Sequence, residues 1–166
     1  MLKKILSKAA CAECRLCCVF DRYDVWETPL FEAGTMEKVA AAVPDAKFAK
    51  KGGGFVLNSG EIADGELFSC PALTESGCML GDDKPFDCRI WPFRVMKSGE
   101  SRVIAVSSLC GSVYGQSHDE LRAFLKEGLA EEIFAYADKF PEAVHELYDN
   151  YSVLLSENEL LSLSTT

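Results

Sequence analysis

Four cysteines within eight residues are the part of this sequence best suited to chemistry. They lie in the segment Cys11-Ala12-Glu13-Cys14-Arg15-Leu16-Cys17-Cys18, which has the spacing C-x2-C-x2-C-C. A gap of two residues lets a tight turn direct neighbouring thiolates at one point, so several sulfur atoms can reach one metal centre. The segment therefore predicts a metal site.

Four more cysteines follow singly, much later in the chain, and folding could bring them to the first group. We therefore predict that all eight cysteines bind metal. The predicted metal ligands are Cys11, Cys14, Cys17, Cys18, Cys70, Cys78, Cys88 and Cys110.

Two kinds of metal centre fit this spacing. Cys11, Cys14 and Cys17 have the spacing that holds three corners of a [4Fe–4S] cluster in bacterial ferredoxins, and Cys70 is followed by a proline, as the remote ligand often is there. That analogy places these four cysteines on one cluster and leaves the other four as a second set. One or two zinc ions, each held by four thiolates, are the alternative. We expect an iron–sulfur cluster ahead of zinc.

The composition favours a folded protein with a core of its own. The chain has 166 residues, of which 48% are hydrophobic, so we expect a single domain over 1–166 that does not depend on disulfides. A net charge of −9 and a pI near 4.7 would repel a phosphate backbone, so we expect no nucleic-acid partner. The partners expected are metal ions and, for some functions, another protein.

The N-terminal residues contain only a short apolar run, which Lys8 interrupts, and no later segment is apolar enough to span a bilayer. We therefore expect no membrane association and a cytoplasmic location. In that reducing compartment, cysteines are better explained as metal ligands than as disulfides.

The expected elements must position these cysteines. Runs at 93–96 and 102–106 predict a β-hairpin that leads to Cys110. Ser117 and Glu120 fit a capping box that opens a helix through about residue 138, and Pro141 opens a second predicted helix through about residue 156. The fold class predicted is α+β: an irregular cysteine-rich metal-binding region (11–110) with a small antiparallel sheet, closed by two C-terminal helices in a tail over 117–160.

The order of the cysteine motifs resembles a known family. Cys11-x2-Cys14-x2-Cys17-Cys18 is followed by Cys70-Pro71-Ala72-Leu73, Gly77-Cys78-Met79-Leu80, Lys84-Pro85-Phe86-Asp87-Cys88-Arg89 and Trp91-Pro92-Phe93. This combination is similar to the CxxCxxCC family of zinc- or iron-chelating proteins, also called the YkgJ cysteine-cluster family. The resemblance covers roughly residues 11 to 110 and implies a metal centre, while a related cluster in flagellin lysine N-methylases suggests a protein-modifying enzyme as an alternative function.

Two positions depart from that family's usual pattern. Lys84 stands where arginine commonly precedes the proline, and Arg15 stands where glycine is common. Lysine keeps the charge but loses the bidentate fork.

Two arginines remain as candidate cofactor-binding residues. Arg89 and Arg94 could offset the negative charge of a cluster or donate hydrogen bonds to its sulfur atoms. Ordinary ion pairs are the alternative for both.

Three functions follow from these observations. The first is a redox or cluster-carrying protein that holds an iron–sulfur cluster. The second is an interaction module stabilised by structural zinc. The third is a protein-modifying enzyme related to the lysine N-methylases, which requires either an open position on the metal centre or a cofactor pocket beside the metal.

Overall fold

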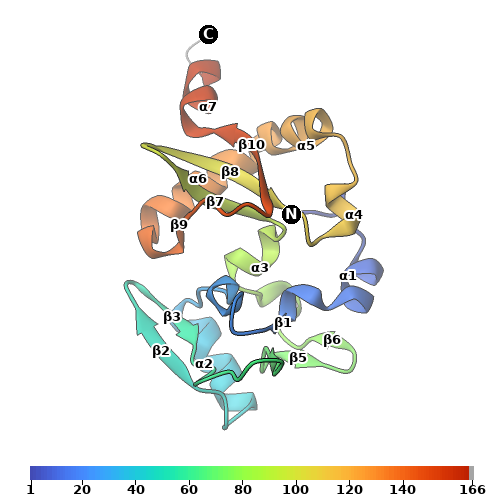
Figure 1. The fold of residues 1–166 in the computed structure, drawn as a ribbon, viewed down its shortest axis with the longest axis vertical. Coiled ribbons are helices and arrows are strands. Elements are labelled where there is room, and N and C mark those ends of the chain that lie inside the picture. The colour runs from blue at the N-terminus through green and yellow to red at the C-terminus, as the bar shows by residue number, and fades with distance from the viewer. Residues whose placement is uncertain (165–166) are drawn as a thin grey trace. The chain divides into compact units, whose positions relative to one another are not determined.

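The computed structural model describes residues 1–164, and the chain divides into two compact units. The N-terminal unit runs from Leu2 to Arg89, and the C-terminal unit runs from Ile90 onward and includes Met1. The architecture is α+β, with small antiparallel sheets and two helices near the C-terminus, as predicted (Figure 1). Whether the two units behave as one domain stays a prediction.

The N-terminal unit is built from short elements joined by irregular chain. Its helical segments are α1 (Lys8–Cys14), η1 (Leu16–Cys18), η2 (Val25–Glu27), α2 (Ala33–Ala42), η3 (Gly81–Asp83) and α3 (Phe86–Ile90). Its strands are β1 (Val19–Phe20), β2 (Phe48–Lys51), β3 (Gly54–Leu57), β4 (Phe68–Ser69), β5 (Leu73–Thr74) and β6 (Gly77–Cys78). The strands form three separate antiparallel pairs, β1–β4, β2–β3 and β5–β6.

A small apolar cluster forms the core of the N-terminal unit. Its buried members are Phe31, Val39, Leu57 and Ala72. Partly buried side chains pack against this cluster, and two of them are Cys70 and Cys78. Two of the predicted metal ligands are therefore in contact with the core of the unit.

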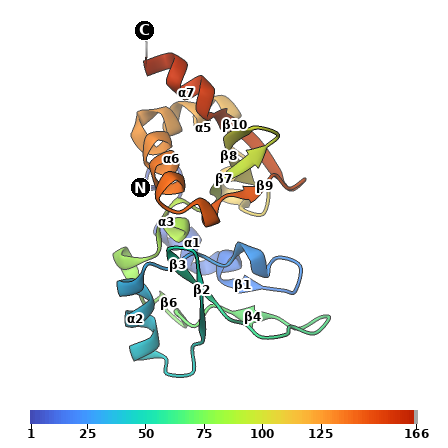
Figure 2. The same ribbon diagram turned by 90° about the vertical axis from the view of Figure 1, so that its left-hand side faces the viewer.

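The C-terminal unit contains a larger sheet covered by helices. Its elements are β7 (Phe93–Ser98), β8 (Ser101–Ser107), α4 (Gly111–Tyr114), α5 (His118–Phe124), η4 (Leu125–Leu129), α6 (Ala130–Lys139), η5 (Pro141–Ala143), β9 (His145–Glu146), β10 (Tyr151–Ser156) and α7 (Glu157–Ser164). The sheet order is β10-β8-β7-β9, and only the β7–β9 pair is parallel among the described strands. Helices α5 and α6 cover one face of this sheet (Figure 2).

Two local predictions in the C-terminal unit are confirmed. Strands β7 and β8 pair as the hairpin expected at 93–96 and 102–106. Ser117 and Glu120 form both hydrogen bonds of the capping box at the start of α5. The helical region continues through α6 by way of a π-helical turn, in which Gly128 takes a φ of 116° that only glycine adopts readily.

The helix predicted from Pro141 to about residue 156 is wrong. Strand β10 occupies its second half, and the last helix, α7, begins only at Glu157. The physical reason is a bulge in β10: the register of its pairing with β8 shifts between Val153 and Leu155, so Leu154 and Leu155 are both buried. Two adjacent buried residues break the alternation of a strand and produce the spacing of a helical face.

Candidate metal centre

The C-x2-C-x2-C-C segment folds as a short helix, a left-handed turn and a 3₁₀ turn. Cys11 and Cys14 lie on α1, whose N-cap, Ser7, accepts a hydrogen bond from the amide of Ala10 at 3.1 Å. Arg15 ends that helix with a φ of 52°, and Cys17 and Cys18 follow in η1. The reversal at Arg15 redirects the chain between the first pair of cysteines and the second.

Three of the later cysteines lie in the same unit as this segment. The amide of Cys70 donates to the carbonyl oxygen of Cys18 at 2.8 Å, next to the β1–β4 pair. Cys78 ends β6, where it pairs with Leu73 of β5, and Cys88 lies on α3. Four separate segments of the N-terminal unit therefore contribute cysteines.

Three of these thiols form one hydrogen-bonded group. The sulfur atoms of Cys17 and Cys18 lie 3.9 Å apart, and Cys17 also shares a hydrogen bond with Cys11. Donation from Cys17 lowers the pKa of Cys11 to about 6 and that of Cys18 to about 7. The pKa of Cys17 itself is raised, because hydrogen bonding to Cys11 and to Cys18 favours its protonated form. Because a thiol has a single proton, Cys17 donates to only one of its two neighbours at a time.

The thiols of Cys70 and Cys88 retain their protons instead. Burial raises the pKa of Cys70 to about 11, and burial also raises the pKa of Cys88 well above its usual value. The charges of Cys18 and Cys78 raise the pKa of both thiols further. These interactions link six cysteines into one electrostatically connected group, which we call the six-cysteine cluster: Cys11, Cys17, Cys18, Cys70, Cys78 and Cys88.

The two remaining cysteines are placed differently. Cys14, at the end of α1, is exposed to solvent. Cys110 is buried and belongs to the C-terminal unit. The predicted division of the eight cysteines into two sets of four, with Cys14 beside Cys11 and Cys110 beside Cys88, stays a prediction.

Lys84 is a residue whose role sequence reasoning did not identify. Its positive charge lowers the pKa of both Cys11 and Cys18, so it lies close enough to favour their thiolate forms. The signal in the sequence was its place just before the Pro85-Phe86-Asp87-Cys88 segment. Lys84 thus offsets negative charge at the cluster, as was expected of the two arginines.

The two arginines predicted to bind the cofactor lie in different units. Arg89 belongs to the N-terminal unit and is exposed, with its guanidinium 5.5 Å from the centre of the Phe86 ring. Arg94 is buried on β7 of the C-terminal unit. Their contact with a metal centre stays a prediction.

The donor set of the six-cysteine cluster fits a thiophilic metal, but the sulfur atoms are not arranged for coordination. All eight cysteines are free thiols. Within residues 1–164, no three Cys, His, Asp or Glu side chains are arranged closely enough to hold a metal ion. Metal binding would therefore require the sulfur atoms to draw closer together, over short elements that are joined by irregular chain.

A cavity of about 350 Å³ lies in the same unit, between η2 and the β2–β3 hairpin. Its walls include Trp26, Lys51 and Asn58, and none of its lining residues is a cysteine. This cavity therefore gives no support to a cofactor pocket beside the metal, which is one of the two features that the methyltransferase alternative predicts.

Comparisons with known proteins add no identity to this description. No family model, no curated protein and no solved structure matches the chain. Among the described helices, none combines the length and the apolar character needed to cross a membrane. The resemblance to the CxxCxxCC family thus rests on the cysteine motifs alone.

Proposed function

We propose that the N-terminal unit is a metal-binding module whose centre is held by thiolates of the six-cysteine cluster. The observation that carries this proposal is the mutual influence of six thiols from four chain segments, which burial alone does not require. Free thiols gathered in this number are typical of zinc and iron–sulfur sites.

The shortage of apolar core in the same unit supports a structural contribution from the metal. In the described chain, seven buried apolar side chains fall between Leu2 and Arg89, against twenty-five from Ile90 onward. Units with little core commonly depend on a metal or disulfides to fold. A metal would supply the missing cross-links between short elements.

An iron–sulfur cluster with a redox or cluster-carrying role is the first candidate for this centre. Its support is the C-x2-C-x2-C spacing together with Cys70-Pro71. The cation of Lys84 near Cys11 and Cys18 would offset part of the charge of a cluster and so influence its potential.

Structural zinc is the second candidate, and the small apolar core favours it. Zinc held by four thiolates is closed and has no redox chemistry, so the function would then be carried by the surface of the unit. The enzyme alternative has only the family resemblance in its favour.

The experiment that tests the proposal is analysis of iron, zinc and acid-labile sulfide in protein purified anaerobically, together with its visible absorption spectrum. Iron with sulfide and a brown colour would support the cluster, and zinc without sulfide would support the structural site. Cys88→Ser should lower the metal content, whereas Ala42→Ser, at an exposed position of α2, should leave it unchanged. Protein that binds neither metal after anaerobic reconstitution would refute the proposal.

A further inference from the structure

Arg15 adopts a backbone conformation that is unfavourable for an arginine. It is the only residue other than glycine with positive φ in the part of the chain that the structure describes, at φ 52°. A side chain with a Cβ disfavours this region, which glycine adopts without penalty. An arginine here therefore needs compensating interactions.

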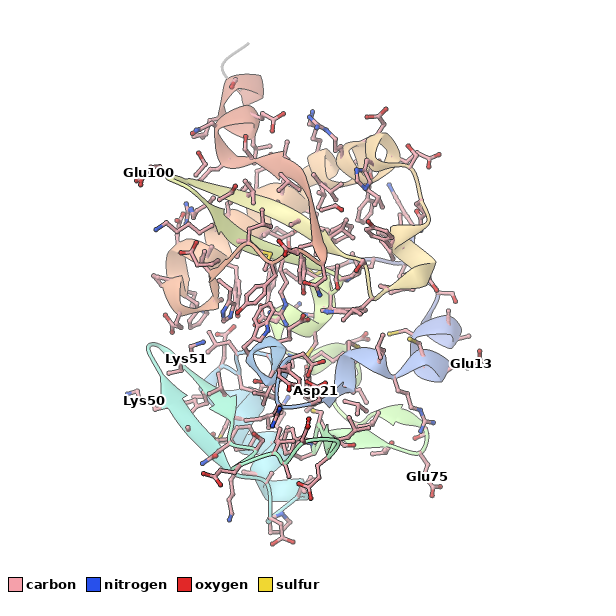
Figure 3. All side chains as sticks on the ribbon, viewed as in Figure 1. Glu13, Asp21, Lys50, Lys51, Glu75 and Glu100 are labelled. Carbon is pink, nitrogen blue, oxygen red and sulfur yellow. The ribbon has the colours of Figure 1, made fainter. Side chains whose placement is uncertain are left out.

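The side chain of Arg15 makes such interactions with two different segments. Its Nε donates to the carbonyl oxygen of Ala12 on α1 at 3.0 Å, and its Nη2 donates to the carbonyl oxygen of Glu75. Glu75 lies at the tip of the hairpin formed by β5 and β6, where Figure 3 shows its side chain pointing outward. One guanidinium thus connects α1 to this hairpin.

A close approach of the two segments lies beside this bridge. A Cβ built on Gly77 would lie 3.9 Å from the Cβ of Ala12, so the start of β6 packs directly against α1. Gly77 is followed by Cys78, and Ala12 follows Cys11. Holding the two segments together therefore fixes where these two cysteines lie with respect to each other.

We propose that Arg15 is a positioning residue, which clamps the β5–β6 hairpin to α1 and so fixes the position of Cys78 relative to Cys11. This inference rests on the proposed metal-binding function, which it deepens by naming a residue that sets the geometry of the centre. Both acceptors are backbone carbonyls, so the clamp depends on residue 15 alone. Only the planar fork of arginine offers separate nitrogens at the required positions, which a lysine ammonium cannot match.

The test compares Arg15→Gly and Arg15→Lys with the unchanged protein. Glycine removes the side chain and also relieves the left-handed backbone, so a gain in order would be expected if the guanidinium had no function. Lysine keeps the charge and removes the fork. Arg22→Lys is the matched control, because Arg22 makes an exposed ion pair with Asp64 at 3.4 Å in the same unit.

The first measurement does not involve a metal. The amide of Met79, just after β6, donates to the carbonyl oxygen of Ala72 at 2.9 Å, and its hydrogen exchange in metal-free protein reports on the order of the hairpin. Loss of one hydrogen bond predicts about three- to tenfold faster exchange in both Arg15 variants and no change in Arg22→Lys. Unchanged exchange in both Arg15 variants overturns the clamp.

The second measurement is titration with Co²⁺, whose sulfur-to-metal charge-transfer absorption reports the number of thiolates on the ion. We expect affinity to fall roughly 10- to 100-fold in both Arg15 variants, as for other residues that orient metal ligands. The intensity per bound Co²⁺ should fall by about a quarter if one of four thiolates is lost. Equal affinity and intensity in the variants would overturn the positioning role.

Failure of the proposed function gives a different result. If the unchanged protein binds no Co²⁺, metal binding fails, and Arg15 has no metal ligand to position. Faster exchange of the Met79 amide would then leave the clamp as a purely structural contact. Each outcome therefore identifies which of the two statements is wrong.

Discussion

Removing the proposed metal should destabilise the N-terminal unit and leave the stability of the C-terminal unit unchanged. The difference follows from what each unit can bury without metal. In the N-terminal unit, the central apolar cluster has only three large buried side chains, Phe31, Val39 and Leu57. The C-terminal unit has fully buried side chains on its sheet and on its helices, among them Ile104 and Ile133.

The expected contribution of a metal is comparable to that of the buried side chains. Burying a large apolar side chain contributes about 1.5–3 kcal/mol, so the large buried side chains of the N-terminal unit contribute together roughly 9–18 kcal/mol; they are Leu2, Phe20, Leu30, Phe31, Val39 and Leu57. A structural zinc ion contributes about 10–16 kcal/mol in small zinc-finger peptides at neutral pH. Metal removal should therefore lower the free energy of unfolding of the N-terminal unit by several kcal/mol and leave that of the C-terminal unit unchanged.

Amide hydrogen exchange, followed by mass spectrometry with and without a chelator under reducing conditions, measures both units at once. Peptides from residues 2–89 should lose protection on chelation, whereas those from β7, β8 and α6 should keep it. As a control, Ile133→Ala should cost the C-terminal unit about 2–5 kcal/mol and leave the metal content unchanged. Equal loss of protection in both units, or none in residues 2–89, would refute this reasoning.

Three further predictions concern single residues or pH. Arg102 donates to Glu157 and, at 2.7 Å, to Asp138, so Arg102→Met should lower the free energy of unfolding by about 1.5–3 kcal/mol in a urea titration. Ser117→Ala removes the cap of α5 and should cost about 1 kcal/mol in the same assay, an effect that an equal urea midpoint would disprove. Metal binding should weaken as pH falls, because the raised pKa of Cys70 keeps its proton on the metal-free protein at neutral pH and the metal must displace it. For each proton released on binding, the metal affinity should fall roughly tenfold for every unit by which the pH is lowered. A Co²⁺ affinity that does not change between pH 6 and 8 would contradict this prediction.

How far the sequence could predict the site depended on the distance between the cysteines along the chain. The first four are close together in the sequence, so C-x2-C-x2-C-C was sufficient to predict a common site; that site stays a prediction, and Cys14 lies outside the six-cysteine cluster. Cys70 reaches this segment through long-range backbone pairing, of its amide with the Cys18 carbonyl. A pair of two-residue strands such as β1–β4 is too short to show an alternation of apolar and polar residues, so it cannot be recognised in a sequence. The sequence could therefore not show which backbone contact brings Cys70 to Cys18.

The fold shows the same limit. The capping box at Ser117 was readable because its two hydrogen bonds join residues three positions apart. Strand β10 could not be recognised, because its bulge buries both Leu154 and Leu155. The register that causes this burial is set only by the pairing of β10 with β8. Hydrogen bonds between residues close in the sequence can be predicted from the residue types. A bulge that is fixed by pairing with another strand instead gives a strand the burial pattern of a helix.

The number of gathered thiols also bears on the kind of metal centre. One tetrahedral zinc ion takes four thiolates, and a [4Fe–4S] cluster takes four, so a single centre of either kind leaves two of the six thiols outside the coordination sphere, whereas two zinc ions can share all six. Cys17 is hydrogen-bonded to both Cys11 and Cys18, which places it at the centre of its group rather than at an edge. A single centre would then leave two thiols as hydrogen-bond donors to the ligands, and such donors to sulfur raise the reduction potential of an iron–sulfur cluster. Hydrogen bonds to sulfur also orient the thiolate ligands of a zinc site, so the surplus of thiols fits either metal, and the analysis of iron, zinc and acid-labile sulfide distinguishes the two.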